Sequence, residues 1–196
     1  MKKIVVASNN PGKLDEFQIL LSPLGIEVIT QVQLGISEAE EPHPTFVENA
    51  LAKARHASRA SGLPALADDS GICVAALNGM PGVNSARFSG LPKSDQRNNS
   101  ALLKAMEFQA DRRAYYYCVL VLVRCWDDPQ PLLAEGAWHG EIALQAFGDL
   151  GFGYDPIFWL PALGKTSAQL ERAHKHAISH RGQAMQVLSE KLKRLL

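Results

Sequence analysis

Cysteine is scarce in this sequence, and long apolar runs are absent. The 196 residues include three cysteines, none of them in a CxxC pair, which is typical of reduced intracellular thiols and argues against a disulfide framework. No apolar run approaches the roughly 18 residues of a membrane span. Lys2-Lys3 is followed by only four apolar residues, Ile4 to Ala7, so we do not expect a secretory leader there. We therefore expect a soluble, cytoplasmic protein without a membrane partner.

Net charge is also absent, because 20 Lys and Arg residues balance 20 Asp and Glu residues. Bulk charge therefore does not predict a nucleic-acid partner. The charges are nevertheless segregated: residues 38–48 contain four acids and no Lys or Arg, whereas residues 165–196 contain seven Lys or Arg and two acids. Such segregation is typical of phosphate-binding enzymes, in which carboxylates hold Mg²⁺ and cations neutralise phosphoryl oxygens. The alternative is that each charged segment is simply a solvent-exposed face, which is the more common case.

Internal repeats, linkers and low-complexity segments are absent as well. With 46% hydrophobic residues, the composition is that of an ordinary globular protein. At this length a chain buries enough surface to fold without a disulfide or structural metal. We expect a single domain over residues 1–196.

Extended and helical patterns alternate along the chain. Strands are expected at residues 4–7, 26–30, 114–125 and 132–138, extended segments at 66–74 and 141–145, and helices at about 14–24, 46–61, 95–108 and from about 178. Thr45 with Glu48 has the capping-box spacing, and Ser94 is a further helix cap. The segment 66–74 reads as two short pieces separated by a polar kink. In the last helix, one face carries Ala184, Leu188, Leu192 and Leu195. Parallel β-α-β units and a central hairpin predict an α/β fold, a mixed sheet with helices on its faces.

Ser8 to Lys13 lies between a predicted strand and a predicted helix. Backbone amides, a helix N-terminus and a lysine ammonium would gather there around one concavity, as an anion site requires. It is not a Walker A loop, because Ala7 replaces the first glycine and Leu14 follows the lysine. An ordinary polar turn is the alternative. The lysine favours an anion site, since the helix dipole disfavours cations in a first turn.

Asp68-Asp69 follows an apolar strand and precedes Ser70-Gly71. Successive strand residues point to opposite sides, so at most one of the two carboxylates is expected to enter a given cleft. That carboxylate could ligate Mg²⁺ or accept a proton from water. A surface Asx turn is the alternative.

Aromatic and basic residues mark two later segments. The loop Phe152-Gly153-Tyr154-Asp155-Pro156 is flanked by glycines, which would let a ring stack on a flat ligand, although such loops are more often core plugs. Lys175, His180 and Arg181 suit phosphate or carbonyl oxygens.

Taken together, five segments resemble the inosine/xanthosine triphosphate pyrophosphatase family, in its bacterial RdgB-type dITP/XTP pyrophosphatase branch. They occur in the family's order, and they are Ser8–Lys13, Ala67–Gly71, Pro81–Phe88, Gly151–Pro156 and Ser179–Gly182. The chain departs from the family pattern at Ser8, where threonine is usual, and at Asn9 and Leu150, where glycine is usual.

The resemblance implies an Mg²⁺-dependent enzyme that cuts ITP, dITP and XTP between the α and β phosphates, releasing the monophosphate and pyrophosphate and so cleansing the nucleotide pool. It implies a homodimer of elongated α/β subunits, with two lobes around a central substrate cleft. Hypoxanthine and xanthine present an acceptor at C6 where adenine presents a donor, so hydrogen-bond donors at that edge would reject ATP.

The resemblance also implies roles for individual residues. Asp69 would be the proton acceptor and a metal ligand, and Glu40 or Glu41 would complete the metal site. The triphosphate would be held by Ser8, Asn9, Asn10, Pro11, Gly12 and Lys13. Further substrate contacts would come from Ser70, Lys175, His180 and Arg181, and the base would lie against Phe152, Gly153, Tyr154 and Asp155.

Two other functions remain open at this point. A Maf-like nucleotide pyrophosphatase has a similar lysine-bearing first loop, but residues 152–156 and 179–182 fit it poorly. A nucleotide-sensing module would bind without hydrolysis, and the presence of Asp69 together with the acidic residues 38–41 argues against it.

Overall fold

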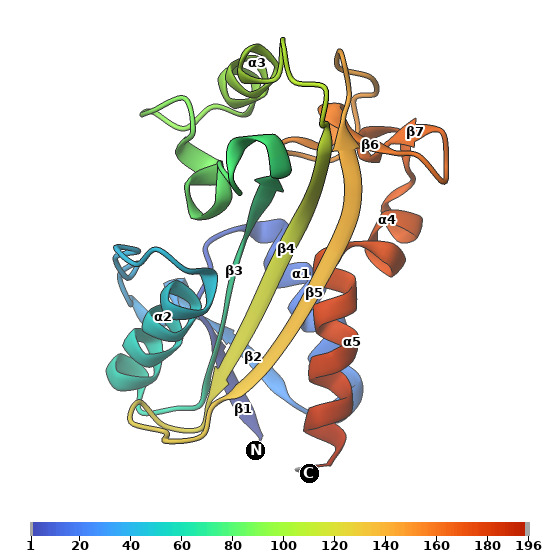
Figure 1. Cartoon of the computed structure of the whole chain (residues 1–196). Helices are drawn as coiled ribbons and strands as arrows, with labels where there is room; N and C mark the ends of the chain where they lie inside the picture. The colour runs from blue at the N-terminus through green and yellow to red at the C-terminus, as the bar shows by residue number, and fades with distance from the viewer. Residues whose placement is uncertain (1, 195–196) are drawn as a thin grey trace. The chain divides into compact units, whose positions relative to one another are not determined.

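The computed structural model describes residues 2–194 as a mixed α/β fold. Within these residues the strands form one seven-stranded sheet in the order β2-β1-β3-β4-β5-β6-β7 (Figure 1). The strands are β1 (Lys3–Val6), β2 (Glu27–Thr30), β3 (Ala65–Val74), β4 (Arg113–Val123), β5 (Leu132–Ile142), β6 (Phe158–Leu160) and β7 (Lys165–Thr166). The helices are α1 (Pro11–Leu21), α2 (Phe46–Ser61), α3 (Asp95–Ala105), α4 (Arg172–Ile178) and α5 (His180–Lys193). The predicted fold class, a mixed sheet with helices, is confirmed.

The sheet is parallel at its first edge and antiparallel at its last. β1 pairs in parallel with β2, in the register Lys3 to Glu27, and also with β3. β6 runs antiparallel to both β5 and β7. β1 is short, β-branched and buried in its last three residues, as expected of a strand with neighbours on both sides.

Helix starts follow the local capping signals. Thr45 accepts a hydrogen bond from the Glu48 amide at the start of α2, and Ser94 accepts one from the Arg97 amide at the start of α3. α2 ends at Gly62, which adopts a φ of 69°, a conformation that costs glycine little. Both residues are confirmed as N-caps, and the Glu48 side chain accepts a hydrogen bond from the Thr45 hydroxyl.

Three sequence-based boundaries are wrong. β3 is one continuous strand through Asp68 and Ser70 rather than two pieces with a kink. The expected extended segment at 141–145 is instead the end of β5, which stops at Ile142. The expected C-terminal helix is preceded by a separate short helix, α4, which ends before Ser179. Leu195 lies outside the described residues.

The chain forms two compact units, each made of separate stretches. Unit 1 comprises residues 2–69, 118–135 and 184–194, and unit 2 comprises residues 70–117 and 136–183. β3, β4 and β5 therefore each contribute residues to both units.

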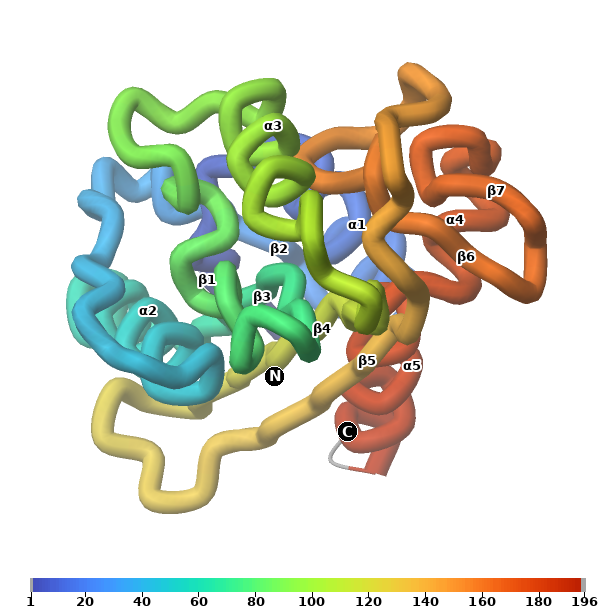
Figure 2. Tube along the Cα trace, turned by 45° about the horizontal axis from the view of Figure 1, so that its top comes forward, coloured from blue at the N-terminus to red at the C-terminus, as the bar shows by residue number. Residues whose placement is uncertain are grey.

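Each unit has its own apolar core. In unit 1, α1 and α5 supply buried side chains to a cluster that includes Phe17, Leu21 and Leu188 together with Ile4 and Leu120 from the sheet. Figures 1 and 2 show α2 on the side of the sheet opposite α5.

In unit 2 the core is rich in aromatic residues. Tyr116, Trp138 and Phe158 contact one another within it, and the ring centroids of Tyr116 and Phe158 are 4.7 Å apart. No helix in residues 2–194 is both long enough and apolar enough to cross a bilayer.

Candidate functional site

The loop between β1 and α1 is held by its own side chains. Asn10 is the N-cap of α1, and its Oδ1 accepts hydrogen bonds from the amides of Gly12 at 2.9 Å and Lys13 at 3.3 Å. The Asn10 amide donates to Ser8 Oγ at 3.2 Å. Three amides of this loop are thus already engaged, so its main attraction for an anion is side-chain charge.

That charge belongs to Lys13, which pairs with a buried carboxylate. Lys13 Nζ lies 2.8 Å from Asp68 Oδ2, and the Asp68 side chain is 1% exposed. The pair explains how a lysine is tolerated in the first turn of α1, where the helix dipole opposes a cation.

Asn9 connects the same loop to the acidic segment. Its amide nitrogen donates to Glu38 Oε1 at 2.7 Å, and its Oδ1 accepts from the Gln31 side chain at 2.7 Å. The side chain that replaces the usual glycine at position 9 therefore joins β1 to the acidic loop.

Asp69 lies in a second charged cluster of unit 1. Its Oδ1 accepts a hydrogen bond from Lys53 Nζ at 3.1 Å, and the same ammonium donates to Glu41 Oε1 at 2.6 Å. Asp69 Oδ2 is buried and has no hydrogen-bond partner among the described residues. One oxygen of this carboxylate is thus fixed, and the other is unoccupied by protein.

The environment shifts the pKa values of both partners. Burial raises the pKa of Asp69 above its ordinary value of 3.8, and nearby Glu41 and Asp68 act in the same direction against the lowering effect of Lys53. For Lys53, burial opposes protonation, but attraction by Asp69, Asp68 and Glu41 outweighs it and raises the pKa. Lys53 therefore stays charged, while Asp69 becomes a stronger base than an exposed aspartate.

The two candidate metal ligands of the acidic loop differ in position. Glu41 and Asp69 form ion pairs with the same ammonium, that of Lys53. Glu40 is exposed and forms no ion pair with residues 2–194. No group of three or more His, Cys, Asp or Glu side chains in that part of the chain has the geometry of a closed metal site. A metal here would have to complete its coordination with other ligands.

Lys53 is a site residue that sequence reasoning missed. It lies on α2 between Asn49 and Ala57, both buried and each four residues away. Residues four apart share a helix face, so Lys53 is a lone charge on a buried face. That spacing was the available signal.

In unit 2, the loop at residues 151–155 is organised around Asp155. This carboxylate is buried, accepts hydrogen bonds from the Phe152 amide at 2.8 Å and Ser167 Oγ at 2.8 Å, and forms an ion pair with Lys175. A Cβ at Gly151, which has a φ of 80°, would lie 2.1 Å from Asp155 Oδ2. The approach of the carboxylate to the loop backbone thus requires glycine.

The members of this loop face different ways. The Phe152 side chain is 54% exposed, and Lys175 Nζ lies 4.8 Å from its ring centroid. Tyr154 is buried, and its hydroxyl donates to the Ser85 carbonyl at 2.7 Å. The Phe152 ring is therefore accessible to a ligand, while the Tyr154 ring packs in the core.

Ser70, His180 and Arg181 also lie in unit 2. Arg181 Nη2 donates to Ser70 Oγ at 3.2 Å, which joins the start of α5 to β3. The His180 ring stacks on Tyr116, with centroids 4.7 Å apart and an interplanar angle of 8°. All three polar residues are buried or half-buried. Tyr116 was not singled out from the sequence, because it is one of three adjacent tyrosines in an apolar strand.

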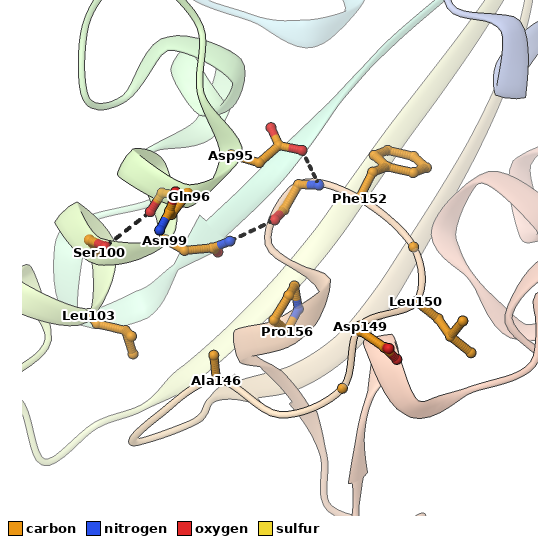
Figure 3. Close-up of a pocket in the computed structure, with 13 residues that line it drawn as sticks. Asp95, Gln96, Asn99, Ser100, Leu103, Ala146, Asp149, Leu150, Phe152 and Pro156 are labelled. Carbon is orange, nitrogen blue, oxygen red and sulfur yellow. Dashed lines mark hydrogen bonds between the residues drawn. The ribbon is translucent and has the colours of Figure 1, made fainter.

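The predicted residues thus form two groups. Unit 1 brings together Lys13 with Asp68, and Glu41 with Asp69 through Lys53. Unit 2 brings together Phe152, Asp155 and Lys175, and joins Ser70 to Arg181. A cavity of about 460 Å³ in unit 2 lies between α3 and the Phe152 loop (Figure 3).

Comparison with known proteins identifies relatives over nearly the whole chain. A dITP/XTP pyrophosphatase of Nitrosomonas europaea is 64% identical over 194 residues, covering 97% of this chain and 96% of that protein. The protein of the same name from Ralstonia nicotianae is 63% identical over 196 residues, with 98% of each covered.

Solved structures agree with this relationship. A HAM1 protein from Coxiella burnetii is 48% identical, has a TM-score of 0.96, and covers 99% of this chain and 100% of its own. The Ham1 protein of Staphylococcus aureus is 41% identical with a TM-score of 0.92, and both chains are fully covered. The model of the Ham1 family matches residues 4–191. The chain belongs to the Ham1 family.

Proposed function

We propose that this protein is a nucleoside triphosphate pyrophosphatase that hydrolyses dITP, XTP and ITP to the monophosphate and pyrophosphate with Mg²⁺ as cofactor. The names of its relatives support the substrate class. Removal of deaminated purine nucleotides from the pool is the corresponding role, performed in the cytoplasm by a homodimer.

The observation that carries the proposal is the asymmetric setting of Asp69. One oxygen is held by Lys53, and the other is buried without a partner among the described residues. A general base needs an unoccupied oxygen, and its efficiency rises as its pKa moves up toward the working pH. The raised pKa of Asp69 therefore supports its role as proton acceptor.

The carboxylates also fit Mg²⁺. This ion prefers oxygen ligands and is usually bound by one or two carboxylates together with substrate phosphates. Glu41 and Asp69, which share the Lys53 ammonium, supply such a pair, whereas Glu40 is exposed and forms no ion pair with residues 2–194. Bound there, Mg²⁺ would neutralise phosphoryl charge and lower the pKa of water.

The triphosphate would be held mainly by lysine side chains. Lys13, which pairs with Asp68 in the first turn of α1, would contact the phosphates, and the wall of that loop would be formed by Ser8, Asn9, Asn10, Pro11 and Gly12. Because Asn10 already binds the amides of Gly12 and Lys13, the ammonium is the main attraction for the phosphates.

The chemical step is a displacement at the α-phosphorus. A water oxygen attacks this phosphorus, its proton passes to Asp69, and the bond to the oxygen bridging the α and β phosphates breaks. Pyrophosphate leaves with the electron pair of that bond. Positioning and neutralisation of charge supply most of the rate enhancement in such reactions.

Residues of unit 2 would select the base. The exposed Phe152 ring offers a stacking surface, with Lys175 beside it and Asp155 holding that ammonium. Ser70, His180 and Arg181 would contribute hydrogen-bond donors. Donors at the C6 oxygen would disfavour adenine, whose C6 amino group leaves them unpaired.

One assay tests this function. Purified protein is incubated with Mg²⁺ and dITP, XTP, ITP, GTP or ATP, and pyrophosphate is measured separately from orthophosphate. We expect pyrophosphate and monophosphate from the first three substrates, and at least about a hundredfold lower turnover in Asp69→Asn, which keeps the shape of the side chain but not its basicity.

Other outcomes would exclude the proposal. Stepwise release of orthophosphate would mean that the γ-phosphorus is attacked instead. Binding without turnover would favour a nucleotide sensor, and preference for pyrimidine triphosphates would favour the Maf-like alternative. The melting temperature of Asp69→Asn serves as the control for folding.

A further inference from the structure

The backbone of Gly153 is held entirely from another element, α3. The Gly153 amide donates to Asp95 Oδ2 at 2.7 Å, and the Gly153 carbonyl accepts from Asn99 Nδ2 at 2.9 Å (Figure 3). Asp95 and Asn99 are four residues apart and so lie on the same face of the helix. Two side chains of one helix thus satisfy both polar groups of a single residue.

Gly153 directly follows the exposed Phe152. On the other side of that ring, the Phe152 amide is bound by the buried Asp155. The two peptide groups that flank Phe152 are therefore anchored to different elements, Asp155 from within the loop and α3 from outside. A ring that remains 54% exposed on a backbone anchored on both sides is preorganised for contact with a ligand.

The position of Asn99 is not explained by other hydrogen bonds of its side chain. Its Oδ1 is buried and has no hydrogen-bond partner in the described part of the chain, which is unfavourable for a polar atom. Among residues 2–194, the only hydrogen bond of its side chain is the one to Gly153. The Asn99 side chain therefore stabilises the loop at Gly153 and not the helix to which it belongs.

We propose that Asp95 and Asn99 are positioning residues for the base of the substrate: they hold the Gly153 peptide from α3 and so keep the Phe152 ring as a preformed stacking surface. This inference rests on the proposed function, because it assumes that Phe152 receives a purine. Neither residue contacts the base in this scheme; both act through the loop.

The variants follow from the two hydrogen bonds. Asp95→Ala removes the acceptor, while Asp95→Asn retains an acceptor oxygen and removes the charge. Asn99→Asp keeps the size of the side chain but replaces the donor to the Gly153 carbonyl. Gln96→Ala is the matched control, since Gln96 lines the same cavity on the same helix turn and is not bonded to the loop.

We expect Asp95→Ala and Asn99→Asp to raise the KM for dITP and the dissociation constant of inosine monophosphate about tenfold, with a small change in kcat. An interaction that is equally strong in the ground and transition states changes KM rather than kcat. Inhibition by inorganic triphosphate, which has no base, should keep its wild-type constant. Asp95→Asn should recover most of the affinity, and Gln96→Ala should behave as wild type.

A second measurement does not depend on turnover. Hydrogen exchange of the Gly153 amide, followed by NMR in the wild-type protein, should be slow and should become fast in Asp95→Ala. Fast exchange in the wild type would overturn the inference, and so would equal KM values in Asp95→Ala, Asn99→Asp and Gln96→Ala. A wild-type protein with a protected Gly153 amide but no turnover of dITP or XTP would instead refute the proposed function alone.

Discussion

Lys53 offsets only part of the negative charge of the two carboxylates that we propose as metal ligands, so this cluster keeps a net negative charge before any ion binds. Its ammonium donates to both Glu41 and Asp69. A divalent ion that binds the same oxygens must share them with this ammonium. Affinity for the ion then depends strongly on which carboxylates remain, because ligand charge sets the strength of such sites.

Glu41 and Glu40 therefore offer a test at the level of single residues. Glu41→Gln should raise the Mg²⁺ concentration for half-maximal activity by about tenfold or more, because it removes one of the few charged ligands. Glu40→Gln should leave that concentration unchanged, since Glu40 is exposed and is not bonded to Lys53.

The measurement is an Mg²⁺ titration of pyrophosphate release at saturating dITP for the wild type and both variants. An equal shift in both variants would mean that Glu40 and Glu41 contribute equally to Mg²⁺ binding, and it would contradict the assignment of Glu41 as the preferred ligand. A shift in Glu40→Gln alone would reverse the assignment.

Single residues were predictable where their own chain neighbours determine their role. Lys13 stands out because a cation in a first helical turn is unfavourable, and Asp68 and Asp69 bind different lysines, as alternation along a strand predicts. Their partners were not predictable, because the pairs Lys13–Asp68 and Lys53–Asp69 join segments that meet only when β1 pairs with β3 and α2 packs against the sheet.

The connection between β4 and β5 depends on one buried carboxylate. Asp128 is 1% exposed and accepts hydrogen bonds from the amides of Arg124 and Gln130, each at 2.9 Å, and from Arg124 Nε at 2.8 Å. The guanidinium of Arg124 holds the pKa of Asp128 well below its ordinary value of 3.8. The ionised form of Asp128 is thus favoured by folding.

This element therefore makes stability depend on pH in a defined direction. A carboxylate with a lowered pKa in the folded state stabilises the protein above its unfolded pKa, near 4, and loses that contribution as the pH falls through the folded value. At pH 7, Asp128→Asn should lower Tm by a few degrees, because about 1 kcal/mol corresponds to about 2–4 °C at this chain length. The difference from wild type should shrink below about pH 4.

Asp111→Asn is the control for this prediction. Asp111 also pairs with an arginine, Arg113, which lowers the pKa of Asp111 to about 2, but the pair is exposed to solvent. Exposed pairs contribute little to stability, so Tm should hardly change. Thermal scans between pH 2 and pH 7 on the three proteins decide the matter, and a pH-independent difference for Asp128→Asn would contradict the assignment.

Elements with strong local signals were predictable, and those determined by distant pairing were not. The starts of α2 and α3 follow from Thr45 and Ser94, whose hydroxyls act within one helical turn. The polar run at Asp68 to Ser70 suggested a break, yet β3 is continuous from Ala65 to Val74, with β1 and β4 as its neighbours in the sheet. α4 was missed because its seven residues show no regular apolar spacing.

Across the whole molecule, β3, β4 and β5 pass from one compact unit into the other. Each of these strands is continuous through both units, so melting one unit frees one end of three strands that the other unit contains. We expect one cooperative unfolding transition for the chain. The tryptophans allow this to be measured, because Trp126 belongs to unit 1 while Trp138 and Trp159 belong to unit 2.

Trp126→Phe confines the tryptophan fluorescence signal to unit 2, whereas far-UV circular dichroism reports on both units. In urea, the fluorescence and circular dichroism signals of this variant should show the same unfolding midpoint. That midpoint should be close to the wild-type value, because the replaced ring is exposed. Two separate midpoints would show that the units unfold independently, and the expectation of a single domain over residues 1–196 would then fail.

The interleaving of the two units also has a consequence for synthesis on the ribosome. The core of unit 1 joins Ile4 and Phe17, made at the start, to Leu188 and Leu192 of α5, made more than a hundred residues later. Unit 2 consists of residues 70–183 without 118–135, so all of its strands and its core are made before α5 emerges. β1 and α1, although translated first, therefore cannot complete their core until α5 has left the exit tunnel. The half of the protein that holds Asp69 is the last to be finished.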